Sequence, residues 1–332
     1  MRIRVSQRWL VAVVLLLSAA APTRVLKAQQ PAKAPDAGSG VETIQIRPNV
    51  FVIFGGGANV TVHVGSEGAV LVDSGSAMTA DKVRAAVQAI TKQKIRLIIN
   101  TSADGDHVGG NEVLAAGGAS LNPNEFNNGD AQAAVLAHEN VLRRMSAPTG
   151  QSALFPIGTW PTETYTARVK SMYVNDEGIQ VIRQLGAHSD GDSIVFFRRA
   201  DVIATGDVVD LRHFPVIDVA RGGSIDGEID ALNRLLELAI PAMPLVYKDG
   251  RTLIVPGHGR ISDHAELVEY RDMVTVIRDV VKNMMGKGMS LEQIKAANPT
   301  QGYRTRYGSD AGPWTTDMFV EAVYKGLMKK TS

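Results

Sequence analysis

The chain has 332 residues, of which 45% are hydrophobic and 21% are charged, and its formal net charge is +1. This balance is typical of one large or two small globular domains, and it excludes a fibrous or largely disordered protein. Lys and Arg are scattered along the chain, so we expect no nucleic-acid partner. Because there is no cysteine, disulfides and a cysteine nucleophile are excluded, and any metal must be held by nitrogen and oxygen.

The N-terminus has the pattern of a signal peptide. The first eight residues carry three arginines, residues 9–21 are apolar, and small residues lead to a cleavage point after Ala28. A buried helix is the alternative, but the apolar run continues into a Pro- and Ala-rich segment and is short for a membrane span. We therefore predict a signal peptide at 1–28, a linker at 29–45, and a periplasmic or secreted protein without stable membrane insertion after cleavage.

Strand-like and helix-like segments alternate beyond the linker. We predict strands in NVFVIFG, VTVHVG, GAVLVDSG, IRLIIN, IQVIRQLG, DSIVFF, DVIATGD and TLIVPGHG, and helices at 79–92 and 225–239. The segment AVLAHENVLRRM is interpreted as a helix with His138 in its middle. Such alternation implies β-sheets covered by helices.

Polar residues collect where the predicted strands end. Five strand ends carry Asp or His: Asp73, the Asp104 to His107 cluster, His188, Asp207 and His258. One such residue is expected of any strand, whereas five indicate a shared rim with converging ligands. Asp106 and His107 are neighbours in sequence, so both reach one ion only in a tight turn, which Gly105 and Gly109 would permit.

Each of these residues also has a simpler interpretation. The aspartates could be turn or N-cap residues, but caps do not require histidines at matching strand ends, so the set favours a metal site. For Asp104 the sequence leaves open a ligand or a solvated loop residue, and for Ser102 a structural role is favoured. The glycine-rich FGGGANV lacks the Lys-Ser/Thr ending of a phosphate loop, and we interpret it as a flexible hairpin over the site.

Four motifs, NTSADGDHVGGN, GAHSDGDS, ATGDVV and VPGHG, in this order resemble those of the metallo-β-lactamase-fold hydrolases. The resemblance spans residues 50–272 and implies an αββα sandwich of two mixed β-sheets flanked by helices, which we place at 46–285. A helical extension at 286–332 is expected to pack on the same domain through Trp314, Phe319 and Tyr324, while Tyr303 and Tyr307 could instead line the substrate groove.

The resemblance implies two metal positions. The family's first loop usually reads H-x-H-x-D-H, whereas Ser102 and Asp104 stand here at the two leading histidines. One position is therefore complete, and it consists of Asp106, His107 and His258 with the bridging Asp207. The other position is altered, and it consists of Asp104 and His188 with the same Asp207. We expect a divalent metal, zinc at the complete position and manganese or iron at the altered one. Asp73 and Ser102 would support the ligands or the loop backbone without binding the metal themselves.

This pattern predicts an exported metal-dependent hydrolase of a small-molecule substrate. A metal-bound hydroxide would attack an ester, lactone, amide or related bond, and Asp106 would act as the catalytic residue that orients the water or relays its proton. The alternatives are a β-lactamase proper, or a catalytically weakened binding protein of the same fold. The sequence carries no signal for an oligomeric state.

Overall fold

The computed structural model describes residues 40–121, 132–148, 153–243 and 250–328, and Ala37–Ser332 form one compact unit. The expected signal peptide lies outside the described residues. Strand β1 begins at Glu42, inside the segment that we expected to be a linker. In the described part of the chain, no helix is both long and apolar enough to cross a membrane.

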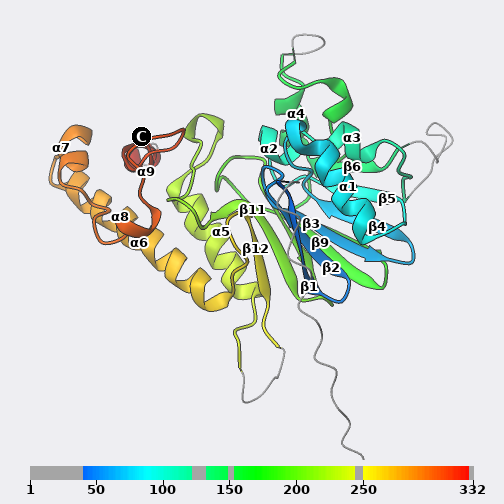
Figure 1. The fold of residues 1–332 in the computed structure, drawn as a ribbon. Helices are drawn as coiled ribbons and strands as arrows, with labels where there is room; N and C mark the ends of the chain where they lie inside the picture. Colours follow the sequence, from blue (N-terminus) through cyan, green and yellow to red (C-terminus); the bar gives the residue numbers. More distant parts are fainter. Residues whose placement is uncertain (1–39, 122–131, 149–152, 244–249, 329–332) are drawn as a thin grey trace, which may run out of the picture. The chain divides into compact units, whose positions relative to one another are not determined.

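The strands form two mixed sheets (Figure 1). The seven-stranded sheet runs in chain order, antiparallel from β1 to β4 and parallel from β4 to β7. Its strands are β1 (Glu42–Arg47), β2 (Val50–Phe54), β3 (Val60–Gly65), β4 (Gly68–Val72), β5 (Ile95–Ile99), β6 (Ala134–His138) and β7 (Glu163–Tyr165). The five-stranded sheet has the order β12-β11-β10-β9-β8, with β11 and β12 parallel. Its strands are β8 (Val169–Val174), β9 (Glu177–Arg183), β10 (Ser193–Phe197), β11 (Val202–Asp210) and β12 (Leu253–His258).

Alternating side chains divide each inner strand between two hydrophobic cores. In β4, Val70 and Val72 belong to a core shared with Val181 and Val195 of the other sheet, so the two sheets pack face to face. The intervening Leu71 points to the opposite face, where it packs with the helix residue Val83. The αββα sandwich expected from the sequence is therefore confirmed.

Helices cover both outer faces of this sandwich. The seven-stranded sheet carries α1 (Ala80–Ile90) and α3 (Asn111–Ala115). The five-stranded sheet carries α5 (Ile225–Leu238) and α6 (His264–Gly286), against which α9 (Thr316–Met328) packs. The remaining helices are short: η1 (Ala77–Thr79), α2 (Gly105–Val108), α4 (Glu139–Met145), η3 (Ile157–Thr159), η4 (Val219–Arg221), α7 (Leu291–Ala296) and α8 (Arg304–Tyr307).

The helix predicted around His138 is wrong in its first half. Ala134–His138 form strand β6, which pairs with β5 on one side and β7 on the other. Helix α4 starts only at Glu139, and His138 caps it by accepting a hydrogen bond from the Asn140 amide. All five residues of β6 are buried, because pairing within the sheet outweighs the local helix propensity of this alanine-rich segment.

Candidate metal centre

Strands β5, β9, β11 and β12, or the segments that directly follow them, carry two groups of possible metal ligands. One group is Asp106, His107 and His258, and the other is Asp104, His188 and Asp207. Within each group the ligand atoms all lie within 4.8 Å of one another. Asp207 adjoins both groups, since its Oδ1 lies 3.1 Å from Nε2 of His107. The structure thus brings together all six residues that the sequence singled out as ligands.

The loop that carries three of these ligands is fixed by close backbone packing. Helix α2 is a single turn that begins directly after Asp104, so Asp106 and His107 project from the same tight turn. A Cβ on Gly109 would lie 2.5 Å from the Ala77 nitrogen, and one on Gly110 would lie 2.2 Å from the Ser74 oxygen. These glycines are therefore required because the loop packs directly on the segment that follows β4.

Asp73 orients the imidazole of His107 through its Nδ1 atom. Its Oδ1 accepts a hydrogen bond from the Thr101 amide at 2.8 Å, and its Oδ2 lies 2.8 Å from Nδ1 of His107. Asp73 itself has a φ of 62°, a left-handed conformation that is uncommon outside glycine. The hydrogen bonds hold this residue in place, and they leave Nε2 of His107 as the nitrogen that faces the ligand groups.

Glycine precedes both ligands that lie on strands of the five-stranded sheet. His258 is the last residue of β12, whereas Asp207, which we expected at a strand end, lies inside β11 because this strand continues to Asp210. Gly206 has a φ of +53°, and a Cβ there would lie 2.4 Å from the Thr101 hydroxyl. A Cβ on Gly257 would lie 2.7 Å from Oδ1 of Asp207. Gly206 therefore lets β11 pass close to Thr101, and Gly257 lets β12 pass close to Asp207.

The donor atoms fit a divalent metal. Nδ1 of His107 donates to Asp73, and Nδ1 of His188 donates to the Val216 carbonyl at 2.7 Å. When such a ring is neutral, its Nε2 carries a lone pair. Nε2 of His188 lies 3.0 Å from Oδ2 of Asp104, and Nε2 of His107 lies 3.1 Å from Oδ1 of Asp207. Nε2 of His107 is also buried without a hydrogen-bond partner among the described residues. Two acceptors facing each other at this distance require a proton or a cation between them.

The titration behaviour of the site agrees with this arrangement. Burial lowers the pKa of His107, but the carboxylates of Asp207 and Asp73 outweigh burial and hold this pKa well above its usual value. The pKa of His188 is raised in the same way, chiefly by its hydrogen bond to Asp104. Burial would raise the pKa of Asp104, but His188 lowers it to about 2. Metal ions and protons therefore compete for these two histidines.

The loop at 211–224 is part of the site and was missed by sequence reasoning. It supplies the Val216 carbonyl behind His188 and the guanidinium of Arg221, whose Nη1 lies 3.0 Å from Oδ1 of Asp104. No motif marks Val216 or Arg221, because both act through contacts that are distant in sequence. Their roles are visible only in the folded chain.

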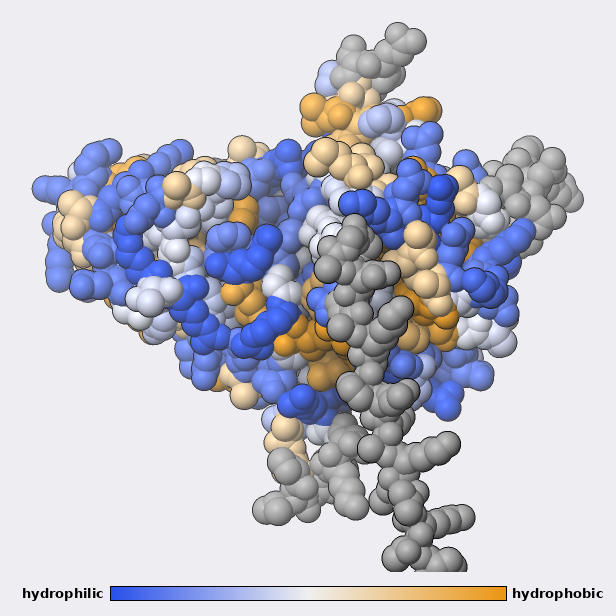
Figure 2. Space-filling view, in the orientation of Figure 1, coloured by the Kyte–Doolittle hydropathy of each residue, from blue (hydrophilic) through white to orange (hydrophobic). Residues whose placement is uncertain are grey.

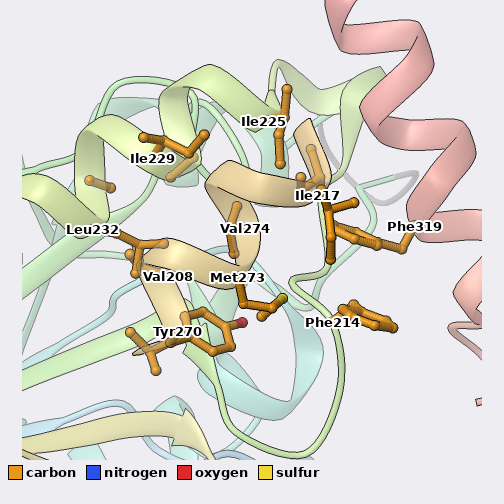
Figure 3. Packing of buried hydrophobic residues seen from close by; sticks show 14 of the residues in the cluster. Val208, Phe214, Ile217, Ile225, Ile229, Leu232, Tyr270, Met273, Val274 and Phe319 are labelled. Atoms are coloured by element: carbon orange, nitrogen blue, oxygen red, sulfur yellow. The ribbon is translucent and has the colours of Figure 1, made fainter. Parts of the chain in front are cut away.

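The C-terminal segment packs on this loop. Phe214 stacks on Phe319 of α9 with a centroid distance of 4.9 Å (Figure 3). Trp314 donates a hydrogen bond to the Phe214 carbonyl at 3.2 Å. The Phe214 amide donates to the Tyr307 carbonyl. Tyr307 is buried against Phe214 and Tyr270, so the possibility that Tyr307 lines the substrate groove is wrong.

The glycine-rich hairpin between β2 and β3 is tied to the ligand loop. Its Ala58 amide donates to the Asp106 carbonyl at 3.1 Å, and its Asn59 amide donates to the Gly257 carbonyl at 2.8 Å. On its other side, the Gly56 carbonyl accepts from the Ser76 amide. The hairpin that we expected to be flexible is therefore hydrogen-bonded to the two segments that carry Asp106 and His258.

Exposed apolar side chains border helix α2. Phe155 lies 3.8 Å from where a Cβ of Gly105 would be, and its neighbours Leu154 and Ile157 are 63% and 78% exposed. Met78 of η1, which contacts α2, is 93% exposed. Residues 153–160 follow α4 at the top of Figure 1, where Figure 2 shows hydrophobic surface. We call Met78, Leu154, Phe155 and Ile157 the apolar rim.

Comparisons with known proteins agree with this fold. The family model of the metallo-β-lactamase superfamily matches residues 53–118, which include the loop with Asp104, Asp106 and His107. A metallo-β-lactamase from Pontibacter korlensis is 17% identical, and the match covers 71% of this chain and 99% of that one with a TM-score of 0.52. The chain has the metallo-β-lactamase fold.

Other solved structures share this metallo-β-lactamase fold. The stereoselective inverting sec-alkylsulfatase Pisa1 from Pseudomonas sp. is 18% identical, with 86% of this chain covered and a TM-score of 0.58. A double mutant of the same sulfatase gives a TM-score of 0.60 at 16% identity, again over 86% of this chain. The chain spans half the length of these sulfatases. No curated protein matches the sequence significantly.

Ser102 lies on the ligand loop, two residues before Asp104. Its hydroxyl accepts a hydrogen bond from the Asp104 amide at 3.2 Å, and the side chain is buried. Ser102 therefore shapes the loop on which Asp104 stands.

Proposed function

We propose that the protein is an exported metal-dependent hydrolase that cleaves an ester, lactone, amide or related bond of a small molecule. Members of the matched superfamily are generally metal-dependent hydrolytic enzymes. The observation that carries the proposal is the pair of imidazole Nε2 atoms, on His107 and His188, each facing a carboxylate oxygen at about hydrogen-bonding distance. These nitrogen and oxygen atoms are donors of the kind that a divalent ion takes once the imidazoles have released their protons.

The two ligand groups would hold the metal with different strength. Asp106, His107 and His258, with Asp207 beside them, offer two imidazoles, which suits zinc. Asp104, His188 and Asp207 offer two carboxylates and one imidazole, which suits manganese or iron. A divalent ion bound here supplies a nucleophile by lowering the pKa of water, and it polarises the bond under attack.

Asp106 has the position required of the proton-handling group. Its side chain is 40% exposed, so substrate and water can reach it. Burial raises its pKa, but the hydrogen bond to His258 and the charge of His107 lower the pKa below its usual value. A carboxylate with a lowered pKa is suited to orient a water molecule through a hydrogen bond, and Nε2 of His258 lies 3.1 Å from its Oδ2.

The neighbouring structures favour particular bonds to test first. Sulfate esters belong among them, because the sec-alkylsulfatases match 86% of this chain whereas the β-lactamase from Pontibacter korlensis matches 71%. Export of the protein keeps a β-lactamase as the second candidate. The apolar rim beside α2 favours substrates that carry an alkyl or aryl group next to the cleaved bond.

Elemental analysis and an activity screen test this function together. The purified protein should retain a divalent metal and hydrolyse at least one ester, lactone, amide, sulfate ester or β-lactam with zinc, manganese or iron, and the variant H258A should lose both properties. Metal retained without any hydrolysis across this panel would instead favour a binding protein of the same fold.

The proposed export has its own test. Mass spectrometry of the protein from its native host should show a mature chain that begins close to Gln29 in an extracytoplasmic fraction. An intact N-terminus in the cytoplasmic fraction would contradict export without affecting the hydrolase proposal.

A further inference from the structure

Arg221 forms an ion pair with one of the candidate ligands. Its Nη1 lies 3.0 Å from Oδ1 of Asp104, while Oδ2 of the same carboxylate lies 3.0 Å from Nε2 of His188. The residues in contact are 117 positions apart in sequence. Asp104 therefore shares its negative charge between a guanidinium on one side and the ligand group on the other.

The guanidinium distinguishes the two ligand groups. In the group of Asp106, His107 and His258, the carboxylate pairs with His258, and no arginine or lysine pairs with it among the described residues. In the other group, Asp104 has a permanent cation as a direct partner. An arginine stays charged at every physiological pH, so it is present whether or not a metal arrives.

Hydrogen bonds and an ion pair within the surrounding loop hold Arg221 in place. Its Nε lies 3.1 Å from Oδ2 of Asp218, and its amide donates to Oδ1 of the same residue at 2.9 Å. Its carbonyl accepts hydrogen bonds from the Asp190 amide and from Nη2 of Arg144. Gly222, with a φ of 87°, ends this turn. The guanidinium is thus positioned before any ligand binds, with little conformational freedom left to lose.

We propose that Arg221 is a positioning residue that keeps the Asp104, His188 and Asp207 group weak for divalent ions, so that the protein works with one tightly bound ion. The inference rests on the proposed function, because it assumes metal binding at the neighbouring group. A fixed positive charge repels a second divalent ion, and it withdraws electron density from the carboxylate that would ligate that ion. The guanidinium then provides the positive charge that a second ion would otherwise provide.

The test measures metal stoichiometry in the full chain, without reference to turnover. Metal-free protein is titrated calorimetrically with Zn²⁺ and with Mn²⁺, and elemental analysis after desalting counts the ions retained. The wild type should retain one equivalent. The variant R221A should retain close to two, with the second dissociation constant at least ~10-fold lower than in the wild type.

Three further variants sharpen this test. R221K retains the charge and should stay near one equivalent. R212A removes an arginine of the same loop that pairs with Asp210, a residue outside both groups, and it should also stay at one. Adding Asp104→Asn to R221A should abolish the second equivalent, because the gain depends on the freed carboxylate. Circular dichroism of each variant checks that it is folded.

The outcomes separate the two proposals. Retention of one equivalent by both the wild type and R221A, of two by the wild type, or loss of tight metal in folded R221A would each overturn the role given to Arg221. A wild type that binds no divalent metal at all would overturn the proposed hydrolase function itself.

Discussion

Oδ2 of Asp73 lies 2.8 Å from Nδ1 of His107, and this contact determines which nitrogen of the imidazole faces the ligand group. Replacing Asp73 with asparagine tests the contact, because asparagine tolerates the positive φ of this position while its charge is lost. We expect D73N to bind zinc roughly 10- to 100-fold more weakly.

Metal titration of D73N measures this effect, with D81N as the control. Asp81 is an exposed residue of α1 that pairs with Arg84, and its substitution should leave zinc affinity unchanged. Equal zinc affinity in D73N and the wild type would show that Asp73 does not orient the ligand.

The two metal positions should respond differently to loss of a side chain. D106A and H258A each remove a ligand from the complete group, so tight metal binding and hydrolysis should disappear together. S102A removes only a hydroxyl that accepts from the Asp104 amide, and its effect should be small. Elemental analysis and turnover measurements decide this, and equal losses in all three variants would refute the division into a strong and a weak position.

A buried acid should make the stability of the metal-free protein depend on pH. Glu228 of α5 is fully buried, and neither of its carboxylate oxygens has a hydrogen-bond partner among the described residues. Burial, aided by the charge of Asp192, raises the pKa of Glu228 well above 4.5. The folded state therefore holds this proton more tightly than the unfolded state. Its stabilising contribution is complete below pH 4.5 and is lost as the pH rises toward the raised value.

Removing this charge should stabilise the protein at neutral pH. E228Q keeps the shape of the side chain, and it should raise the free energy of unfolding by about 1.4 kcal/mol for each pH unit above 4.5, up to the raised pKa of Glu228. Urea denaturation between pH 5 and 8 measures the change, with E237Q on the exposed face of the same helix as the control. An E228Q profile parallel to that of the wild type would contradict the prediction.

The C-terminal extension should affect the metal site as well as stability. Phe319 is fully buried and stacks on Phe214 of the loop that carries Val216 and Arg221. F319A should lower the free energy of unfolding by about 3 to 5 kcal/mol. It should also alter metal affinity, because the Val216 carbonyl that orients His188 loses its support.

Denaturation and metal titration of F319A are compared with those of M318A, an exposed residue of the same helix, which should change neither quantity appreciably. If F319A loses stability but binds metal like the wild type, the extension only packs on the domain and does not support the site.

The apolar rim should determine which substrates bind. I157S removes an exposed apolar side chain next to Phe155, so stability should be unaffected while KM for substrates with a long alkyl group rises by roughly three- to tenfold. The comparison is with a short-chain substrate of the same bond type, whose KM should hardly change. V276S on the exposed side of α6 is the control. If the ratio of KM for the long-chain substrate to KM for the short-chain substrate is the same in I157S and the wild type, the apolar rim does not take part in substrate binding.

The sequence by itself determined the main strands, the helices α1 and α5, and the six candidate ligands. This was possible because burial on one face leaves a periodic pattern of apolar residues, as in β4 and α1, and because strand ends place polar residues at one rim. The aspartates and histidines at those ends were visible without any knowledge of their partners.

Only the tertiary structure decided the rest. Ala134–His138 became a strand because β5 and β7 pair with it, which local propensity does not encode. The ring nitrogen that His188 presents depends on the Val216 carbonyl, and the charge beside Asp104 depends on Arg221. Such contacts join residues far apart in the chain, and their strength depends on distances and burial that exist only after the two sheets have packed.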